Sequence, residues 1–87
     1  MENKIEDLKK LGYSPVWVYS AMPNEDDPDH AHQYDTHLFI LEGEISIKMN
    51  GKVVILKPGD KIDIPREKVH AGKAGAAGCK YIVAEKH

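Results

Sequence analysis

The sequence has little of what secreted, membrane-spanning or nucleic-acid-binding proteins require. It holds a single cysteine, so no disulfide can form within the chain, and this favours a reducing compartment. It has no apolar run near the roughly 18 residues of a transmembrane helix, and its charged start, Met1–Glu6, lacks a signal-peptide core. The net charge of −2 argues against a basic surface for nucleic acid. We therefore expect a cytoplasmic protein that contacts neither nucleic acid nor membrane.

The chain is also short, which limits it to one small domain. A domain of 87 residues buries only about 60–65% of its unfolded surface, so a bound metal or a partner subunit would add stability. Residues 3–11 predict a short helix that Asn3 caps and Gly12 ends. We divide the chain into this N-terminal helix, residues 1–12, and a single β-domain, residues 13–87, on which it packs.

Short strands and turns dominate the β-domain. The β-branched and aromatic run Val16–Tyr19 predicts a strand, and the apolar–polar alternation of Ile45–Met49 predicts another that is half buried. Asn50-Gly51 is a strong signal for a two-residue hairpin turn. Seven or eight such strands without helices between them indicate an all-β fold, a small antiparallel barrel or sandwich.

Three further segments complete the expected layout. Residues 22–29 are acidic and contain two prolines, so they predict a solvated connection. Residues 30–42 predict one bent strand or two short ones, followed by a turn at Gly43. The glycine-rich residues 74–78 predict a flexible turn before the last strand, residues 79–85.

Several of these strands are apolar on both faces. In Val16–Tyr19 and in Leu38–Leu41, residues of either parity are large and apolar. We therefore expect a homodimer joined through outer strand faces, with the N-terminal helix covering part of the sheet; the alternative is a monomer in which the helix alone covers that face. The residues expected in the core are Val16, Val18, Leu38, Ile40, Ile45, Ile47, Val54, Leu56, Ile62, Ile64, Ile82 and Ala84. Cys79 is expected to be a small buried residue and no nucleophile.

Histidines carry the chemistry that the sequence indicates. His30 and His32 are two apart, so in a strand they lie on one face. His70, brought in from another strand, would complete a site of three imidazoles. Such a site binds divalent transition metals and leaves coordination positions open for water or substrate. The pair alone fits equally well two polar residues of an exposed loop.

The spacing of residues around these histidines has a family likeness. Gly43 follows the pair at the distance of a conserved motif glycine, and Gly59, Pro65 and His70 have the spacing of a second motif. In these features residues 30–70 resemble the cupin superfamily, and the spacer between the motifs matches the shortest one of microbial cupins. The resemblance implies a jelly-roll barrel with a divalent metal (Fe, Mn, Ni, Cu or Zn) on the three histidines.

One position departs from the family pattern. Thr36 stands where most cupins have a glutamate ligand, and its hydroxyl is a poor metal ligand. His37 is next to it and is the alternative ligand, but strand parity turns it away from the face of His30 and His32. We therefore expect His37 to be an outward or interface residue, unless a bulge between His32 and Thr36 reverses the parity.

A site of three neutral imidazoles suits anionic ligands. It leaves a divalent ion its full charge, which favours enolates, thiolates and carboxylates. The resemblance implies a metal-dependent oxygenase or isomerase acting on a small anionic molecule, or alternatively a non-catalytic small-molecule-binding or sensory module. Tyr34 shares the parity of the histidines and is a candidate catalytic donor, or simply a residue of the barrel wall. Arg66, the sole arginine, is a candidate clamp for an anionic substrate, or a solvated loop charge.

Overall fold

The computed structural model describes residues 4–87, which form one short helix followed by six antiparallel strands. The predicted all-β class is confirmed. The position of the helix cap expected at Asn3 lies outside the described residues, and no helix among residues 4–87 is long and apolar enough to cross a membrane. The elements are α1 (Lys4–Lys10), β1 (Val16–Ala21), β2 (Asp26–His30), β3 (Asp35–Met49), β4 (Lys52–Leu56), β5 (Lys61–Ile64) and β6 (His70–Lys86).

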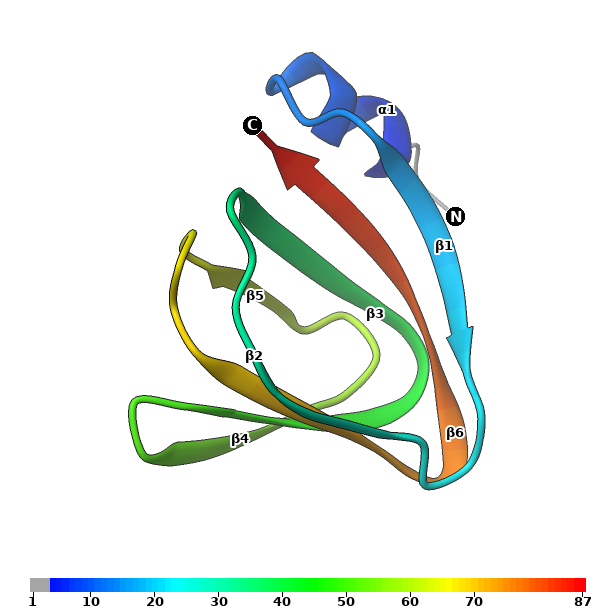
Figure 1. Ribbon diagram of the computed structural model, residues 1–87. Coiled ribbons are helices and arrows are strands. Elements are labelled where there is room, and N and C mark those ends of the chain that lie inside the picture. The colour runs from blue at the N-terminus through cyan, green and yellow to red at the C-terminus, as the bar shows by residue number, and fades with distance from the viewer. Residues whose placement is uncertain (1–3) are drawn as a thin grey trace.

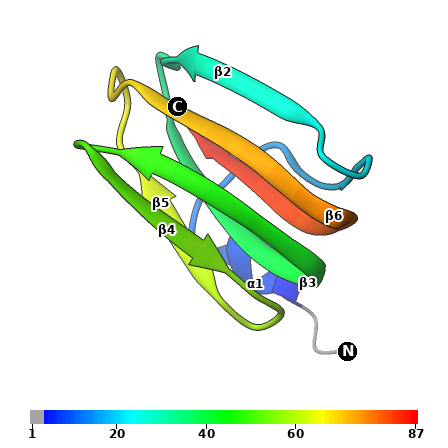
Figure 2. The same cartoon turned by 90° about the horizontal axis from the view of Figure 1, so that it is seen from below.

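Two long bent strands, β3 and β6, build both walls of the barrel. They pair with each other along nearly their whole length and curve together (Figure 1). The second half of β3 and the first half of β6 lie between β4 and β2, and Figure 2 shows these four strands side by side. The other halves pair with β5 and β1 to form the second wall. The shared strands therefore hold the two walls face to face.

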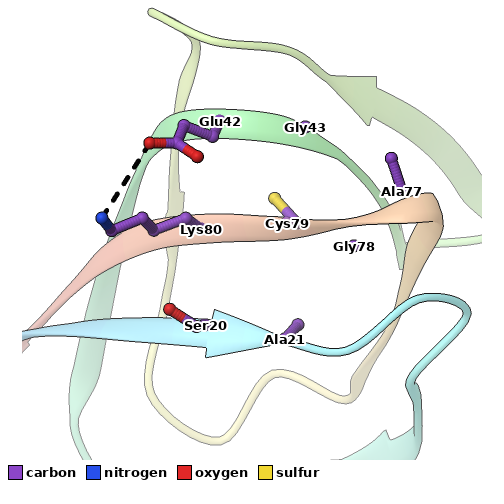
Figure 3. A pocket seen from close by; sticks show the side chains of 8 residues that line it. All are labelled: Ser20, Ala21, Glu42, Gly43, Ala77, Gly78, Cys79 and Lys80. Atoms are coloured by element: carbon purple, nitrogen blue, oxygen red, sulfur yellow. Dashed lines mark ion pairs between the residues drawn. The ribbon is translucent and has the colours of Figure 1, made fainter.

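The bend between the walls depends on glycine. Gly43 interrupts the β3–β6 register and has φ 75°, and a Cβ at this position would collide with the carbonyl oxygen of Gly78. Gly78 has φ 82°, and a Cβ there would lie 2.7 Å from the carbonyl oxygen of Ala21. Three backbones thus meet where only glycine fits. Figure 3 shows the shallow depression that this crossing leaves, with the Glu42–Lys80 ion pair at its edge.

Three segments that the sequence predicted as turns or loops belong wholly or partly to strands, so these predictions are wrong. Gly43 is a bulged bend inside β3 and not a turn between strands. Residues 74–78 belong to the continuous β6, where Ala74 pairs with Ile45 and donates its N–H to the carbonyl of Glu25. Part of the acidic segment 22–29 is β2, which pairs with β6. In each place hydrogen bonds to distant strands satisfy the backbone and outweigh the turn propensity of the local sequence.

The core consists of two clusters on opposite sides of the second wall. The inner cluster fills the barrel and contains Leu38, Ile40, Ile45, Ile47, Leu56, Ile64, Ala74 and Cys79. The outer cluster joins Leu8 of α1 to Ile82 and Ala84 of β6, and Val16, Phe39 and Leu41 pack against it. The helix therefore covers much of the apolar outer face. Two residues expected in the core, Val18 and Val54, are 40% and 45% exposed because they lie on the edge strands β1 and β4.

Candidate metal centre

Three histidines from two parts of the chain meet at the inner face of the barrel. His30 ends β2 and His70 begins β6, and the two lie opposite each other in the strand register. His32 follows in the connection to β3, and its ring centroid is 4.8 Å from that of His30 and 5.2 Å from that of His70. One nitrogen of each ring can be chosen so that all three lie within 4.8 Å of one another. This separation is compatible with three ligands on a single ion.

Backbone carbonyls fix which nitrogen of two rings is available. Nδ1 of His30 lies 2.7 Å from the carbonyl oxygen of Pro28, and Nδ1 of His70 lies 2.9 Å from that of Lys68. A carbonyl only accepts hydrogen bonds, so each Nδ1 carries the proton and donates it. In the neutral form of each ring this leaves the lone pair on Nε2, the form in which imidazole binds a metal.

The third ring, His32, is held in a different way. It stacks on Tyr34 with a centroid distance of 4.9 Å and an interplanar angle of 18°. Burial lowers the pKa of His32, and the neighbouring His30 and His70 lower it further. The surroundings thus favour the neutral imidazole, which is the ligand form.

A small cavity opens beside the three rings. Its volume is about 130 Å³, and of the described residues no lysine or arginine lines it. Its wall is mainly aliphatic and is formed by Leu38, Ile45, Ile47, Ile64 and Val83. Tyr81 also contributes, and burial raises the pKa of its phenol, so the group stays neutral. The cavity therefore offers an apolar space next to a cluster of nitrogens that could hold a metal ion.

Thr36 and His37 lie on opposite faces of β3. Thr36 is 6% exposed and lines the cavity, and its Oγ1 has no hydrogen-bond partner among the described residues. His37 faces the outer cluster, where its Nδ1 lies 2.7 Å from Oδ1 of Asp63 and its ring packs against Tyr13. Parity thus gives the correct face for both residues, although His37 is buried there and not exposed.

Tyr34 and Arg66, the other two candidate residues, do not line the cavity. Tyr34 lies beside it, between His32 and His87, and burial raises the pKa of its phenol with a further contribution from Glu85. The Arg66 guanidinium is on the outside, with Nε 3.6 Å from the Asp35 carboxylate. Its arrangement is that of a solvated loop charge.

Cys79 is the buried core residue expected from the sequence. It packs in the inner cluster, and burial raises the pKa of its thiol. Although Cys79 lies at the depression shown in Figure 3, none of the histidines among residues 4–87 lines that depression with it. A thiol kept protonated in this way is a poor nucleophile.

The sequence reasoning missed two carboxylates near the histidines. Glu85 lies opposite Thr36 in the strand register, its side chain is 15% exposed, and it accepts a hydrogen bond of 2.9 Å from Nε2 of His87. Asp27 lines the cavity mouth, with a carboxylate oxygen 3.6 Å from Nε2 of His30. Glu85 has the same strand parity as Tyr81, which lines the cavity, and this parity was the signal in the sequence that could have found it. Asp27 was missed because residues 22–29 were expected to be a loop and not to include the strand β2.

The comparisons agree with this fold. A family model described as "Cupin domain" matches residues 17–84. Since this is most of the chain, the protein belongs to the cupin family. No curated protein sequence matches it significantly.

Solved structures share the fold of this chain. The structure of KdgF from Halomonas sp. superposes on this chain with a TM-score of 0.74 and 18% sequence identity, and the match covers 83% of this chain and 67% of that one. A cupin superfamily protein from Desulfitobacterium hafniense DCB-2 gives 0.72 at 26% identity, covering 83% and 66%. Protein NMB1881 from Neisseria meningitidis gives 0.70 at 20% identity, covering 83% and 72%. The chain thus spans about two thirds of the length of these relatives.

Proposed function

We propose that this chain binds one divalent transition-metal ion through His30, His32 and His70. The observation that carries the proposal is the approach of one nitrogen from each ring to within 4.8 Å of the other two. The donation of both Nδ1 protons to backbone carbonyls supports it, because this arrangement leaves two Nε2 lone pairs free. Imidazole donors suit Fe, Mn, Ni, Cu and Zn.

The reaction class that we propose is metal-dependent oxygenation or isomerisation of a small anionic molecule. A bound metal would act as a Lewis acid toward such a molecule. Three neutral ligands leave the charge of the ion at +2, and the adjoining cavity of about 130 Å³ provides a mainly aliphatic space for the ligand. The chain's own residues would thus orient the anion and shield it.

The second candidate is a binding or sensory module without turnover. The choice of titratable side chains at the cavity favours this candidate. Besides the histidines, the titratable residues of the described chain that line the cavity are Tyr81 and Asp27. Burial raises the pKa of Tyr81, and the Asp27 side chain is 69% exposed. Neither is a buried carboxylate, which is one of the groups that serve enzymes as a general base.

We also propose a homodimer. The edge strand β4 carries Val53, Val54 and Ile55, which are 62%, 45% and 55% exposed. An edge strand with this much uncovered apolar surface is suited to pairing with another chain. Sedimentation equilibrium of wild type and Val53→Lys/Ile55→Lys tests this: a dimer that becomes a monomer supports it, and a monomeric wild type overturns it.

Elemental analysis tests the metal proposal. We would compare tagless protein purified without chelator, the variant His30→Ala/His32→Ala, and the control His87→Ala, which removes an exposed histidine outside the trio. Near-stoichiometric metal in wild type and control but none in the double variant is expected. Iron would direct assays to oxygen uptake with thiols and diketones, and zinc or manganese to isomerisation. No metal in any sample, and none after reconstitution, would overturn the proposal.

A further inference from the structure

We propose that the Thr36 hydroxyl is the hydrogen-bond donor to a small monoanion whose charged end lies at the three histidines and whose short apolar body fills the cavity. This inference rests on the metal proposal and adds to it the size, charge and hydrogen-bond contact of the ligand.

The first observation is the unsatisfied hydroxyl itself. Thr36 is 6% exposed, it lines the cavity together with Leu38 and Ile64, and its Oγ1 has no partner among residues 4–87. A buried polar atom without a partner is unfavourable and therefore uncommon in a folded protein. A ligand in the cavity that accepts a hydrogen bond from Oγ1 would remove this penalty.

The second observation is the size of the space. The cavity has a volume of about 130 Å³. An apolar cavity of about 150 Å³ in another protein accommodates benzene, so the space here suits a body of about five or six heavy atoms. Its aliphatic wall would contact carbon, and besides Thr36 and the histidines the polar side chains of the described residues that line it are those of Tyr81 and Asp27. A short-chain carboxylate, or an enolate or thiolate of similar size, fits these limits.

The third observation concerns charge. No lysine or arginine of the described chain lines the cavity, so an anion there would depend on the metal for its countercharge. Asp27 at the mouth is a carboxylate, and it would repel a second negative group at the far end of the ligand. The site therefore favours a monoanion over a dianion.

Threonine at position 36 also favours an anionic ligand. A carboxylate at residue 36 would reduce the charge of the metal site from +2 to +1, whereas a hydroxyl leaves it unchanged. The hydroxyl also donates a hydrogen bond to an anion, which an ionised carboxylate cannot do. Thr36 is in this account a residue that positions the ligand and sets its charge.

The test is a titration of the Co²⁺-loaded protein with short carboxylates, in which the visible absorption of the cobalt ion reports ligand binding. The ligands are acetate, propionate, butyrate, hexanoate and succinate, and the variants are Thr36→Val, which keeps the shape, and Thr36→Ser, which keeps the hydroxyl. Co²⁺ affinity is measured separately for each protein by calorimetry, so that metal binding and ligand binding are distinguished.

We expect Thr36→Val to weaken butyrate binding about 10-fold or more, because this variant loses a hydrogen bond to a charged group. The butyrate affinity of Thr36→Ser should stay within about threefold of wild type, and the Co²⁺ affinity of both variants should be unchanged. In the wild type, affinity should rise about fourfold per methylene from acetate to butyrate, fall at hexanoate, and be weaker for succinate than for butyrate. Val83→Leu, which reduces the cavity, should move the optimum to a shorter acid.

Equal butyrate affinity of wild type and Thr36→Val would overturn the inference while leaving the metal proposal intact. The same holds for a wild type that binds all the acids equally, a result that needs no variant. A wild type that takes up no Co²⁺ would overturn both.

Discussion

The two faces of β3 differ in whether their buried polar side chains have hydrogen-bond partners. On the outer face, His37 is buried but has Asp63 as a hydrogen-bond partner and Tyr13 as a packing neighbour. On the inner face, Thr36 is buried without any partner in the described chain, and it shares a cavity with three histidines that each offer a nitrogen within 4.8 Å of the other two. A satisfied polar group stabilises the fold, whereas an unsatisfied one at a cavity points to a ligand. The comparison thus separates the histidine that supports the barrel from those that serve a site.

The largest expected effect is on metal-dependent stability. His70→Ala should abolish the loss of melting temperature that a chelator causes in the metal-loaded wild type. Metal at a hundredfold excess over its Kd contributes about 2.7 kcal/mol to the folded state. His37→Ala, the control from the other face, should start from a lower melting temperature yet keep the full chelator effect, as thermal denaturation with and without chelator will show. Loss of the chelator effect in His37→Ala would contradict the division between the faces.

The core gives the next effect in size. Ile40→Ala should destabilise the protein by about 2–5 kcal/mol, because Ile40 is 1% exposed within the inner cluster. Val53→Ala on the edge strand β4 should change the stability by less than about 0.5 kcal/mol. Urea denaturation of both variants, at a protein concentration where the wild type is monomeric, provides the measurement. Similar losses in the two variants would contradict the exposed position of Val53 on the edge strand.

A smaller effect is expected from the partner of His37. Asp63→Asn should destabilise the protein by about 0.5–1 kcal/mol, because the carboxylate is 73% exposed and solvent competes for its hydrogen bond with Nδ1 of His37. Asp60→Asn is a matched control on the preceding turn, where the side chain accepts a hydrogen bond from Lys57 and does not contact His37. Metal content should be the same in both variants, and a change in Asp63→Asn alone would link the outer face to the site.

The smallest effect concerns acid stability at Glu25. This carboxylate accepts hydrogen bonds from the Tyr19 hydroxyl and the Met22 amide, and these hold its pKa below the usual 4.5. The unfolded chain therefore takes up the proton first as pH falls, so stability present above pH 4.5 is lost below it. Denaturation of wild type and Glu25→Gln at pH 7 and pH 3.5 should show a smaller acid loss in the variant; equal losses would exclude this contribution.

Local patterns in the sequence predicted much of the fold. Asn50 and Gly51 have φ 57° and 74° and join β3 to β4 with Met49 opposite Lys52, as the hairpin signal required. The alternation of Ile45 and Ile47 likewise placed both in the core. These features depend on neighbours along the chain, which a sequence displays directly.

What the sequence did not reveal depends on partners far along the chain. The strand β2 contains acidic residues and Pro28, and it forms because β6 offers hydrogen-bonding groups to its backbone. Residues 74–78 continue β6 for the same reason. Among the site residues, the histidine motif and the parity of Thr36 were readable. The strand parity of Glu85 was readable as well, but its proximity to His32 was not, since that depends on the pairing of β6 with β3.

The central claim is that His30, His32 and His70 form one metal site. The most direct measurement is calorimetric titration of the metal-free protein with Co²⁺ or Zn²⁺, in wild type, His70→Ala and His37→Ala. The account predicts one ion per chain for wild type and His37→Ala, with affinity reduced at least about 100-fold in His70→Ala. Equal binding by wild type and His70→Ala, or none by the wild type, would contradict it.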